Sequence, residues 1–149
     1  MSSTNDKGPM LGALLRLANQ TMTEQLVRWL ATSGFDDIQP AHSAVIQPLW
    51  DLPDGARLTT LARQSRITKQ SMSALVEHLE KHGYVERVAD PDDARASLVR
   101  LTARGRAYGK AIRQFARDCE ADLAKRVGAR RVEDLRKTLE LLRESWLTS

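Results

Sequence analysis

The chain has 149 residues, of which 42% are hydrophobic and 28% charged, as is typical of one globular domain with one core. The formal net charge is +4; residues 1–56 carry 3 Lys and Arg against 6 Asp and Glu, residues 57–106 carry 10 against 6, and residues 107–149 carry 10 against 7. This basic middle and end favour a polyanionic partner, since Lys and Arg neutralise phosphates. Without a stretch of about 18 apolar residues or a signal-like start, the sequence predicts a cytoplasmic protein with no membrane partner.

Residues 1–9 are predicted to be a flexible N-terminus, and residues 10–149 a single domain. Apolar side chains at helical spacing predict a first helix over residues 10–32, with Gly34 as its stop. A second helix is expected to begin with Pro40 in its first turn. Pro48 lies inside it and lacks an amide hydrogen, so we expect a kink or an early end there.

The next segment is predicted to start with a short strand at Arg57-Leu58. A short helix should follow, capped by Thr59 or Thr60 and ending at Gln64, because a threonine oxygen accepts hydrogen bonds from the free amides of a helix start. A second capping residue follows this short helix closely, so we expect a second helix to be joined to it by a short turn.

That cap is Thr68, after a turn at residues 65–67, and it starts a helix that Gly83 ends. One face of this helix is an apolar stripe of Met72, Leu75, Val76 and Leu79. The opposite face is short and polar and consists of Gln70, Ser73, Ala74 and Glu77. A helix with such a face can enter a major groove and contact base edges.

A β-hairpin is predicted next, with strands over residues 84–88 and 98–101 and a charged loop over residues 90–96. The predicted fold is therefore mainly α with a small β-hairpin wing, a winged helix-turn-helix whose reading unit covers about residues 40–101.

Three motifs in this stretch resemble the MarR family of dimeric bacterial transcriptional regulators. They are LxxLA at Leu58–Ala62, LExxGYVxR at Leu79–Arg87 and DPDDxRxxxxxLTxxG at Asp90–Gly105. The flanking helices fit the family by their layout and not by a motif. The resemblance implies a winged-helix repressor that binds double-stranded DNA.

Two helices are predicted after the hairpin, with Thr102 as the first cap and Gly128 between them. In the second, an alternating spacing of three and four residues is typical of helices that pack along each other. That seam consists of Val132, Leu135, Leu139, Leu142 and Trp146. Together with the first helix, the segments of about residues 10–32 and 102–147 are predicted to be dimerisation helices of a homodimer. A monomeric helical bundle is the alternative.

The predicted DNA contacts lie on the reading helix and next to it. Contacts to bases or phosphates are predicted for Lys69, Gln70, Ser71 and Ser73, since glutamine can pair with adenine and serine is permissive. Ala74 stands near a position where the family often has arginine, so a phosphate contact is absent there. Contacts to the DNA backbone are predicted for Arg63 and Arg66. The alternative is a solvated helix face.

In the wing, Arg95 is predicted to enter a narrow minor groove, where the negative potential is enhanced. Asp93 can accept a hydrogen bond from its guanidinium or from loop amides and so hold it. The family resemblance places wing function at the same Asp-x-Arg pattern. The alternative is an exposed ion pair, worth at most about 1 kcal/mol.

Metal and redox chemistry are not favoured. His78 and His82 have the spacing of a zinc pair, but a zinc site needs three or four protein ligands, and the third histidine, His42, is far away in the sequence. The single cysteine, Cys119, excludes an intrachain disulfide and lies on an inward stripe, where cysteine behaves as a small apolar residue. Without a nucleophile motif, we expect no enzyme, no metal and no cofactor.

The resemblance also implies a small aromatic effector ligand, bound between the dimer helices and the reading unit. The candidate pocket residues are Arg16, Trp29, His42, Val45, Ile46, Leu49 and Trp50. Apolar residues at helical spacing more often fill a core. The sequence thus predicts a ligand-responsive repressor acting as a homodimer on a pseudo-palindromic operator; the alternative is a helical protein-interaction module whose winged domain does not contact DNA.

Overall fold

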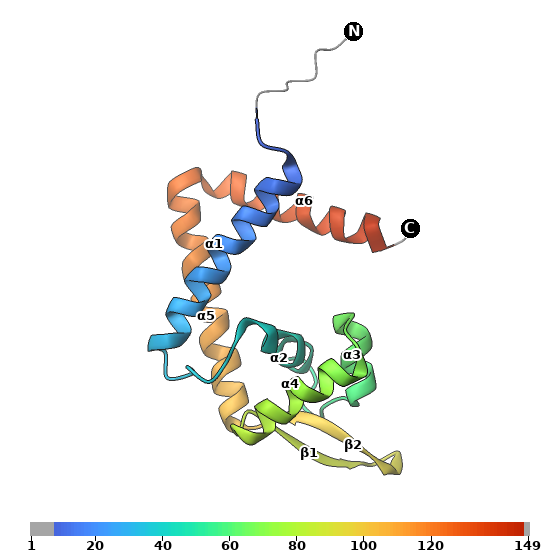
Figure 1. Ribbon diagram of the computed structural model, residues 1–149. Coiled ribbons are helices and arrows are strands. Elements are labelled where there is room, and N and C mark those ends of the chain that lie inside the picture. Colours follow the sequence, from blue (N-terminus) through green and yellow to red (C-terminus); the bar gives the residue numbers. More distant parts are fainter. Residues whose placement is uncertain (1–7, 148–149) are drawn as a thin grey trace. The chain divides into compact units, whose positions relative to one another are not determined.

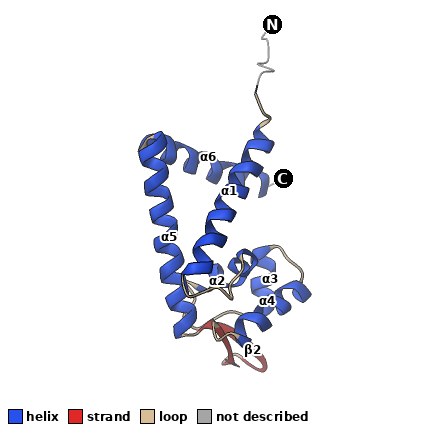
Figure 2. Ribbon diagram, turned by 60° about the vertical axis from the view of Figure 1, so that its left-hand side comes forward, coloured by secondary structure: helices blue, strands red, loops and turns tan. Residues whose placement is uncertain are grey.

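The computed structural model describes residues 8–147, with side chains through residue 145. Among the described residues, nine elements follow one another, and their contacts gather in two compact units, Met1–Arg106 and Ala107–Ser149. The predicted class is confirmed, since the chain is mainly helical and its strands form one hairpin (Figure 1; Figure 2). The predicted flexible start falls largely on residues 1–7, outside the described residues.

The first unit begins with α1 (Leu11–Thr32), which ends just before Gly34 at φ 84°, as predicted. A short 3-10 turn, η1 (Pro40–His42), leads into α2 (Ser43–Leu49). The early end expected at Pro48 is confirmed, because α2 stops one residue later. Val45, Ile46 and Leu49 are each at most 1% exposed, so α2 forms the centre of the core of this unit.

The helix-turn-helix consists of α3 (Leu58–Ser65) and α4 (Lys69–Lys81). Two local predictions for α3 are wrong: Arg57-Leu58 is not a strand, and the helix begins at Leu58 without a threonine cap, because Ala56 alone bridges to Val99 of the hairpin and the chain turns into the helix at once. For α4 the predictions are confirmed. Thr68 accepts a hydrogen bond from the Ser71 amide at 3.1 Å, and Gly83 follows the helix at φ 77°.

The core of the unit is the apolar stripe of α4 packed on α2, α3 and the hairpin. Met72, Val76 and Leu79 are fully buried, while Gln70, Ala74 and Glu77 on the other face are exposed. Each such side chain contributes about 1.5–3 kcal/mol by leaving water. The stripe therefore fixes which face of α4 remains open to solvent.

The hairpin comprises β1 (Val85–Asp90) and β2 (Asp93–Leu101). Its strands are longer than predicted, and the turn is only residues 91–92. Ala89 pairs with Ser97, but the next residue, Asp90, pairs with Asp93. Residues 94–96 of β2 therefore have no cross-strand partner in the described hairpin and form a bulge.

The second unit contains α6 (Ala129–Leu147) and nearly all of α5 (Ala103–Val127), with Gly128 between the two helices. An ion pair of 2.7 Å from Arg136 to Glu120 connects them. Leu135 and Leu139 of the predicted seam are 49% and 42% exposed, and the Trp146 side chain lies outside the described residues. Among residues 8–147, no helix is long and apolar enough to cross a membrane.

Candidate nucleic-acid interface

The open face of α4 presents the residues that the sequence singles out for contacts to DNA. Lys69, Gln70, Ser71 and Ala74 are exposed and Ser73 is half-buried. Ser71 also belongs to the cap, since its hydroxyl accepts a hydrogen bond from the Thr68 hydroxyl at 2.9 Å. Gln70 makes no such bond among the described residues, so its amide is available to an outside partner.

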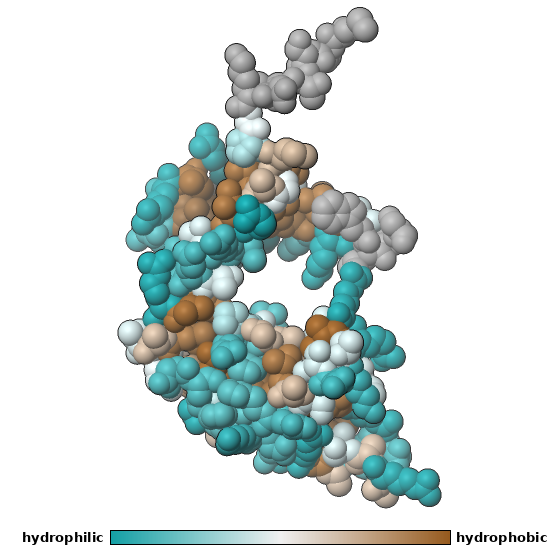
Figure 3. Space-filling model, in the orientation of Figure 1, coloured by the Kyte–Doolittle hydropathy of each residue, from teal (hydrophilic) through white to brown (hydrophobic). Residues whose placement is uncertain are grey.

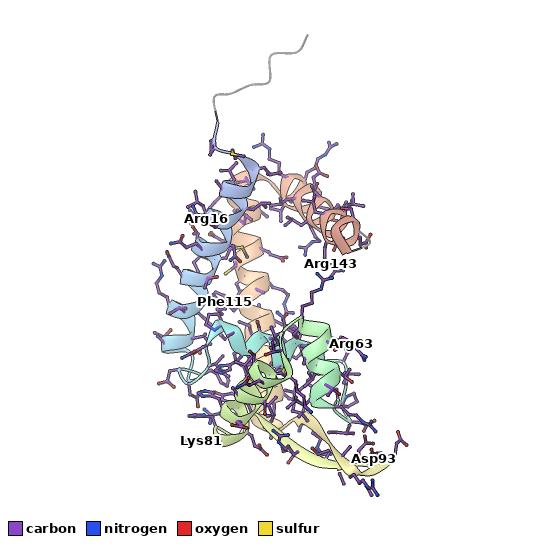
Figure 4. All side chains as sticks on the ribbon, turned by 45° about the vertical axis from the view of Figure 1, so that its right-hand side comes forward. Arg16, Arg63, Lys81, Asp93, Phe115 and Arg143 are labelled. Atoms are coloured by element: carbon purple, nitrogen blue, oxygen red, sulfur yellow. The ribbon has the colours of Figure 1, made fainter. Side chains whose placement is uncertain are left out.

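Arg66 forms the turn between α3 and α4 in an unusual backbone conformation. Its φ of 55° and ψ of 38° place it in the left-handed region, and it is the one residue other than glycine with positive φ among residues 8–147. This conformation costs an L-residue about 1 kcal/mol, which glycine would avoid. Arg66 is exposed, and so is Arg63, which lies on α3 (Figure 4).

The wing residues lie on β2 and not in a loop, which corrects the predicted hairpin loop of residues 90–96. Asp93 is at the tip of the hairpin (Figure 4), and its carboxylate accepts a hydrogen bond from the Arg95 amide at 3.0 Å. Arg95 lies in the bulge and is exposed. Bulges redirect side chains away from the regular pleat, and hydrophilic side chains cover this end of the hairpin (Figure 3).

The ten cations of residues 57–106 differ in whether they have a carboxylate partner; Lys81 and Arg106 have none among the described residues, although Arg106 donates to the Leu101 carbonyl. Four arginines have a carboxylate partner: Arg57 with Asp90, Arg87 with Glu80, Arg100 with Glu86 and Arg104 with Asp37. Among the described residues, no carboxylate pairs with Arg63, Arg66, Lys69 or Arg95. The four cations that the sequence assigns to DNA are thus all left with unneutralised charge.

The base of the wing is fixed by an ion pair that the sequence did not reveal. Arg57 Nε lies 2.6 Å from Oδ2 of Asp90, whose side chain is 4% exposed, and the Asp92 amide donates to Oδ1. The hydrogen bond from that amide lowers the pKa of the Asp90 carboxyl. Partial burial acts in the opposite direction and raises it, while Arg57 lowers it further. The ion pair holds the turn of the hairpin to the residue that precedes α3.

A second cluster, also missed from the sequence, lies where α4 meets β1 and α5. The Asp37 carboxylate accepts hydrogen bonds from the Tyr84 hydroxyl and from Arg104 Nη2, the latter at 3.0 Å. The Arg104 guanidinium also lies 4.4 Å from the centre of the Tyr84 ring and donates to the His82 carbonyl at 2.8 Å. Partial burial raises the pKa of Asp37, but Tyr84 and Arg104 outweigh it and keep that pKa below its ordinary value.

The three histidines stack on one another. The ring centres of His42 and His78 are 4.4 Å apart, and those of His78 and His82 are 4.2 Å apart. His78 Nε2 and His82 Nδ1 each contact a backbone carbonyl at 2.8 Å, which fixes the proton on those atoms, while His42 Nδ1 accepts from the Gln39 amide. Among the described residues, no three His, Cys, Asp or Glu side chains are arranged to hold a metal ion.

The candidate effector residues are dispersed. Arg16 is exposed on α1 and Trp29 is half-buried there, while His42, Val45, Ile46 and Leu49 belong to the buried core. Leu49 and Trp50 line a pocket of about 260 Å³ at the end of α2. Its other lining residues, which the sequence did not single out, are Leu52, Pro53, Leu101 and Arg106.

Comparison with known proteins gives consistent matches. A model of the MarR family matches residues 37–96. The HTH-type transcriptional repressor Rv2887 of Mycobacterium tuberculosis is 31% identical over 117 residues, covering 70% of this chain and 84% of that protein. Streptococcus pneumoniae FabT, crystallised in complex with DNA, has a TM-score of 0.81 at 20% identity, covering 93% of this chain and 96% of FabT. Reduced MarR from E. coli has a TM-score of 0.76 at 25% identity, covering 92% of this chain and 98% of the MarR chain.

Proposed function

Because the chain belongs to the MarR family of transcriptional regulators, we propose that it is a sequence-specific DNA-binding protein, a ligand-responsive repressor that acts as a homodimer on a pseudo-palindromic operator. The observation that carries the proposal is that four exposed cations on the helix-turn-helix and the wing have no carboxylate partner among the described residues: Arg63, Arg66, Lys69 and Arg95. A cation without a carboxylate partner contributes most to the free energy of binding phosphate, because no ion pair within the protein has to break first.

The geometry supports a division of roles. The open face of α4 enters a major groove, where Gln70 can donate to and accept from adenine. Arg63 and Arg66 bind phosphates of the DNA backbone and so set the register of α4 on the duplex. Arg95, aimed by the bulge, enters the adjacent minor groove, where negative potential is highest when the groove is narrow.

The homodimer is supported by apolar side chains that remain exposed on three helices of one chain. On α1, Leu11, Leu14, Leu17, Met22 and Val27 are 47–67% exposed, and Leu123, Leu135, Leu139 and Leu141 on α5 and α6 are 39–66% exposed. Apolar surface of this extent marks an interaction site. We propose that a second copy of the chain covers this apolar surface, because a two-fold dimer matches a palindromic DNA site.

The proposal is tested by fluorescence anisotropy with the duplex upstream of the protein's own gene and a random duplex of equal length, at two salt concentrations. We expect tighter binding to the upstream duplex and a steep loss with salt. Arg95→Ala should weaken binding roughly tenfold. Arg66→Gly should lower the salt slope by about 1, while relief of the strained backbone raises the free energy of unfolding by about 1 kcal/mol.

The matched control is Arg87→Ala, which removes an arginine of the same hairpin that is already paired with Glu80. It should change affinity far less than Arg95→Ala. A footprint should show two inverted half-sites about 10 base pairs apart, as a dimer on one face of DNA requires. Equal binding to both duplexes, or equal effects of the two alanine variants, would contradict the proposal.

The effector is proposed to be a small aromatic acid bound in the pocket of Leu49, Trp50 and Arg106. Apolar walls suit an aromatic ring, and a guanidinium suits its carboxylate. Titration with a panel of aromatic acids should change tryptophan emission and weaken DNA binding, and Trp50→Phe should abolish most of the emission change. Flat titrations across the panel would count against an effector of this class.

A further inference from the structure

The cluster of Asp37, Tyr84 and Arg104 lies at the far end of α4 from the residues proposed to contact DNA. Three segments that are distant in sequence meet there: the turn after α1, the junction of α4 with β1, and the first turn of α5. Tyr84 is fully buried, and Asp37 has 21% of its side chain exposed. Asp37 is the centre of the cluster, because both oxygen atoms of its carboxylate are used.

The same segment also holds the last turns of α4 directly. The Asp37 carbonyl accepts a hydrogen bond from His78 Nε2, and Arg104, oriented by the Asp37 carboxylate, donates to the carbonyl of His82, the C-cap of α4. The orphan carbonyls of a helix end need such partners. The end of α4 is therefore fixed by groups that Asp37 supplies or orients.

We propose that Asp37 is a positioning residue for DNA recognition: it fixes the C-terminal end of α4 to the first turn of α5 and thereby sets the angle at which α4 meets DNA. The inference rests on the proposed function. Gln70 lies twelve residues, or about 18 Å, before His82 at the anchored end, so a swing of about 5° displaces it by about 1.6 Å. Hydrogen bonds to base edges tolerate only about 0.5 Å, so sequence discrimination depends on the anchor.

The electrostatic effect of removing Asp37 on DNA affinity is opposite in direction to the effect of losing the anchor. Removal of a carboxylate from a protein that binds a polyanion should, by electrostatics alone, strengthen binding to any DNA. Loss of the anchor should instead weaken binding to the preferred sequence only. Phosphate contacts persist, so the salt slope should not change.

The test uses the full chain with the upstream duplex and the random duplex, and it compares Asp37→Ala, Asp37→Asn and Tyr84→Phe with Asp36→Ala. Asp36 is the exposed neighbour of Asp37, so its variant removes the same charge without the cluster. We expect Asp37→Ala to lose about tenfold in affinity for the upstream duplex and less than twofold for the random one. Asp37→Asn, which keeps one acceptor oxygen, should lie between it and the wild type, and Asp36→Ala should lose nothing.

Tyr84→Phe keeps the ring under Arg104 and removes only the hydroxyl, so it carries the test if Asp37→Ala does not fold. Its effect on affinity should not add to that of a folded Asp37→Ala variant, because that variant has already lost the hydrogen bond from the Tyr84 hydroxyl. Unchanged discrimination in folded Asp37 variants, or an equal loss for both duplexes, overturns the inference. Failure of the proposed function is seen separately, as a wild type that does not prefer the upstream duplex.

Discussion

Replacement of Gly105 by alanine is expected to lower the free energy of unfolding by about 3 kcal/mol or more. A Cβ atom there would overlap the Tyr84 carbonyl oxygen and lie 3.1 Å from Leu101 Cδ2. The first turn of α5 would have to move away, breaking the bonds from the Thr102 amide to the Tyr84 carbonyl at 3.0 Å and from the Thr102 hydroxyl to the Gly83 carbonyl at 2.5 Å. Urea denaturation followed by circular dichroism measures the loss.

Gly12→Ala is the matched control, since Gly12 is also helical and a Cβ there meets nothing within 4 Å. It should be neutral or raise stability by up to about 0.5 kcal/mol, because alanine is the better helix former. If both variants lose the same stability, the close approach of α5 to Tyr84 is not the cause.

Acidification from pH 6.5 to about 4 is expected to remove about 3 kcal/mol of stability through His42. The pKa of His42 falls from 6.5 to about 4, first because the ring is buried and then because His78 and His82 lie close, while Asp37 opposes the shift. The unfolded chain therefore takes up a proton below pH 6.5, whereas the folded chain does so only near pH 4. The free energy of unfolding must fall as the pH decreases through this window.

The slope of the unfolding free energy against pH between 6.5 and 4.5 tests this expectation. His42→Asn keeps an acceptor for the Gln39 amide but cannot titrate, so its slope should be clearly shallower than that of the wild type, whatever its stability at pH 7. The carboxyls of Asp37 and Asp90 have lowered pKa values and act below this window. Equal slopes for the two proteins would show that His42 is not the titrating group.

Elements with a local cause could be predicted from the sequence. The cap at Thr68, the stripe of α4 and the stop at Gly83 all involve residues within one helix, and the hairpin follows from turn formers between alternating segments. The start of α3 could not be predicted in this way. It depends on the bridge of Ala56 to Val99, 43 positions further along the chain, which local propensity does not record.

The candidate site shows the same division. Most of the residues proposed to contact DNA could be named from the sequence because they lie on the polar face of a periodic helix or in the hairpin, and their contacts to DNA stay a prediction. Asp37, Tyr84 and Arg104 could not be named, since Asp37 is 47 and 67 positions from its partners. His42 could be named from the sequence, but its stacking on His78 could not. The sequence also did not show which arginines remain unpaired, because the pairing depends on where the fold brings carboxylates of β1, of α4 and of the segment after α1.

The left-handed backbone at Arg66 has a consequence for any attempt to engineer this protein. A library selected only for heat resistance would favour glycine at this position, since glycine relieves the strain. The selected proteins would then be more stable but would lack the phosphate contact proposed for Arg66. Selection in the presence of the DNA duplex would keep arginine, because bound ligand adds its own free energy to the folded state. Selection for thermostability and selection for DNA binding should therefore favour different residues at position 66.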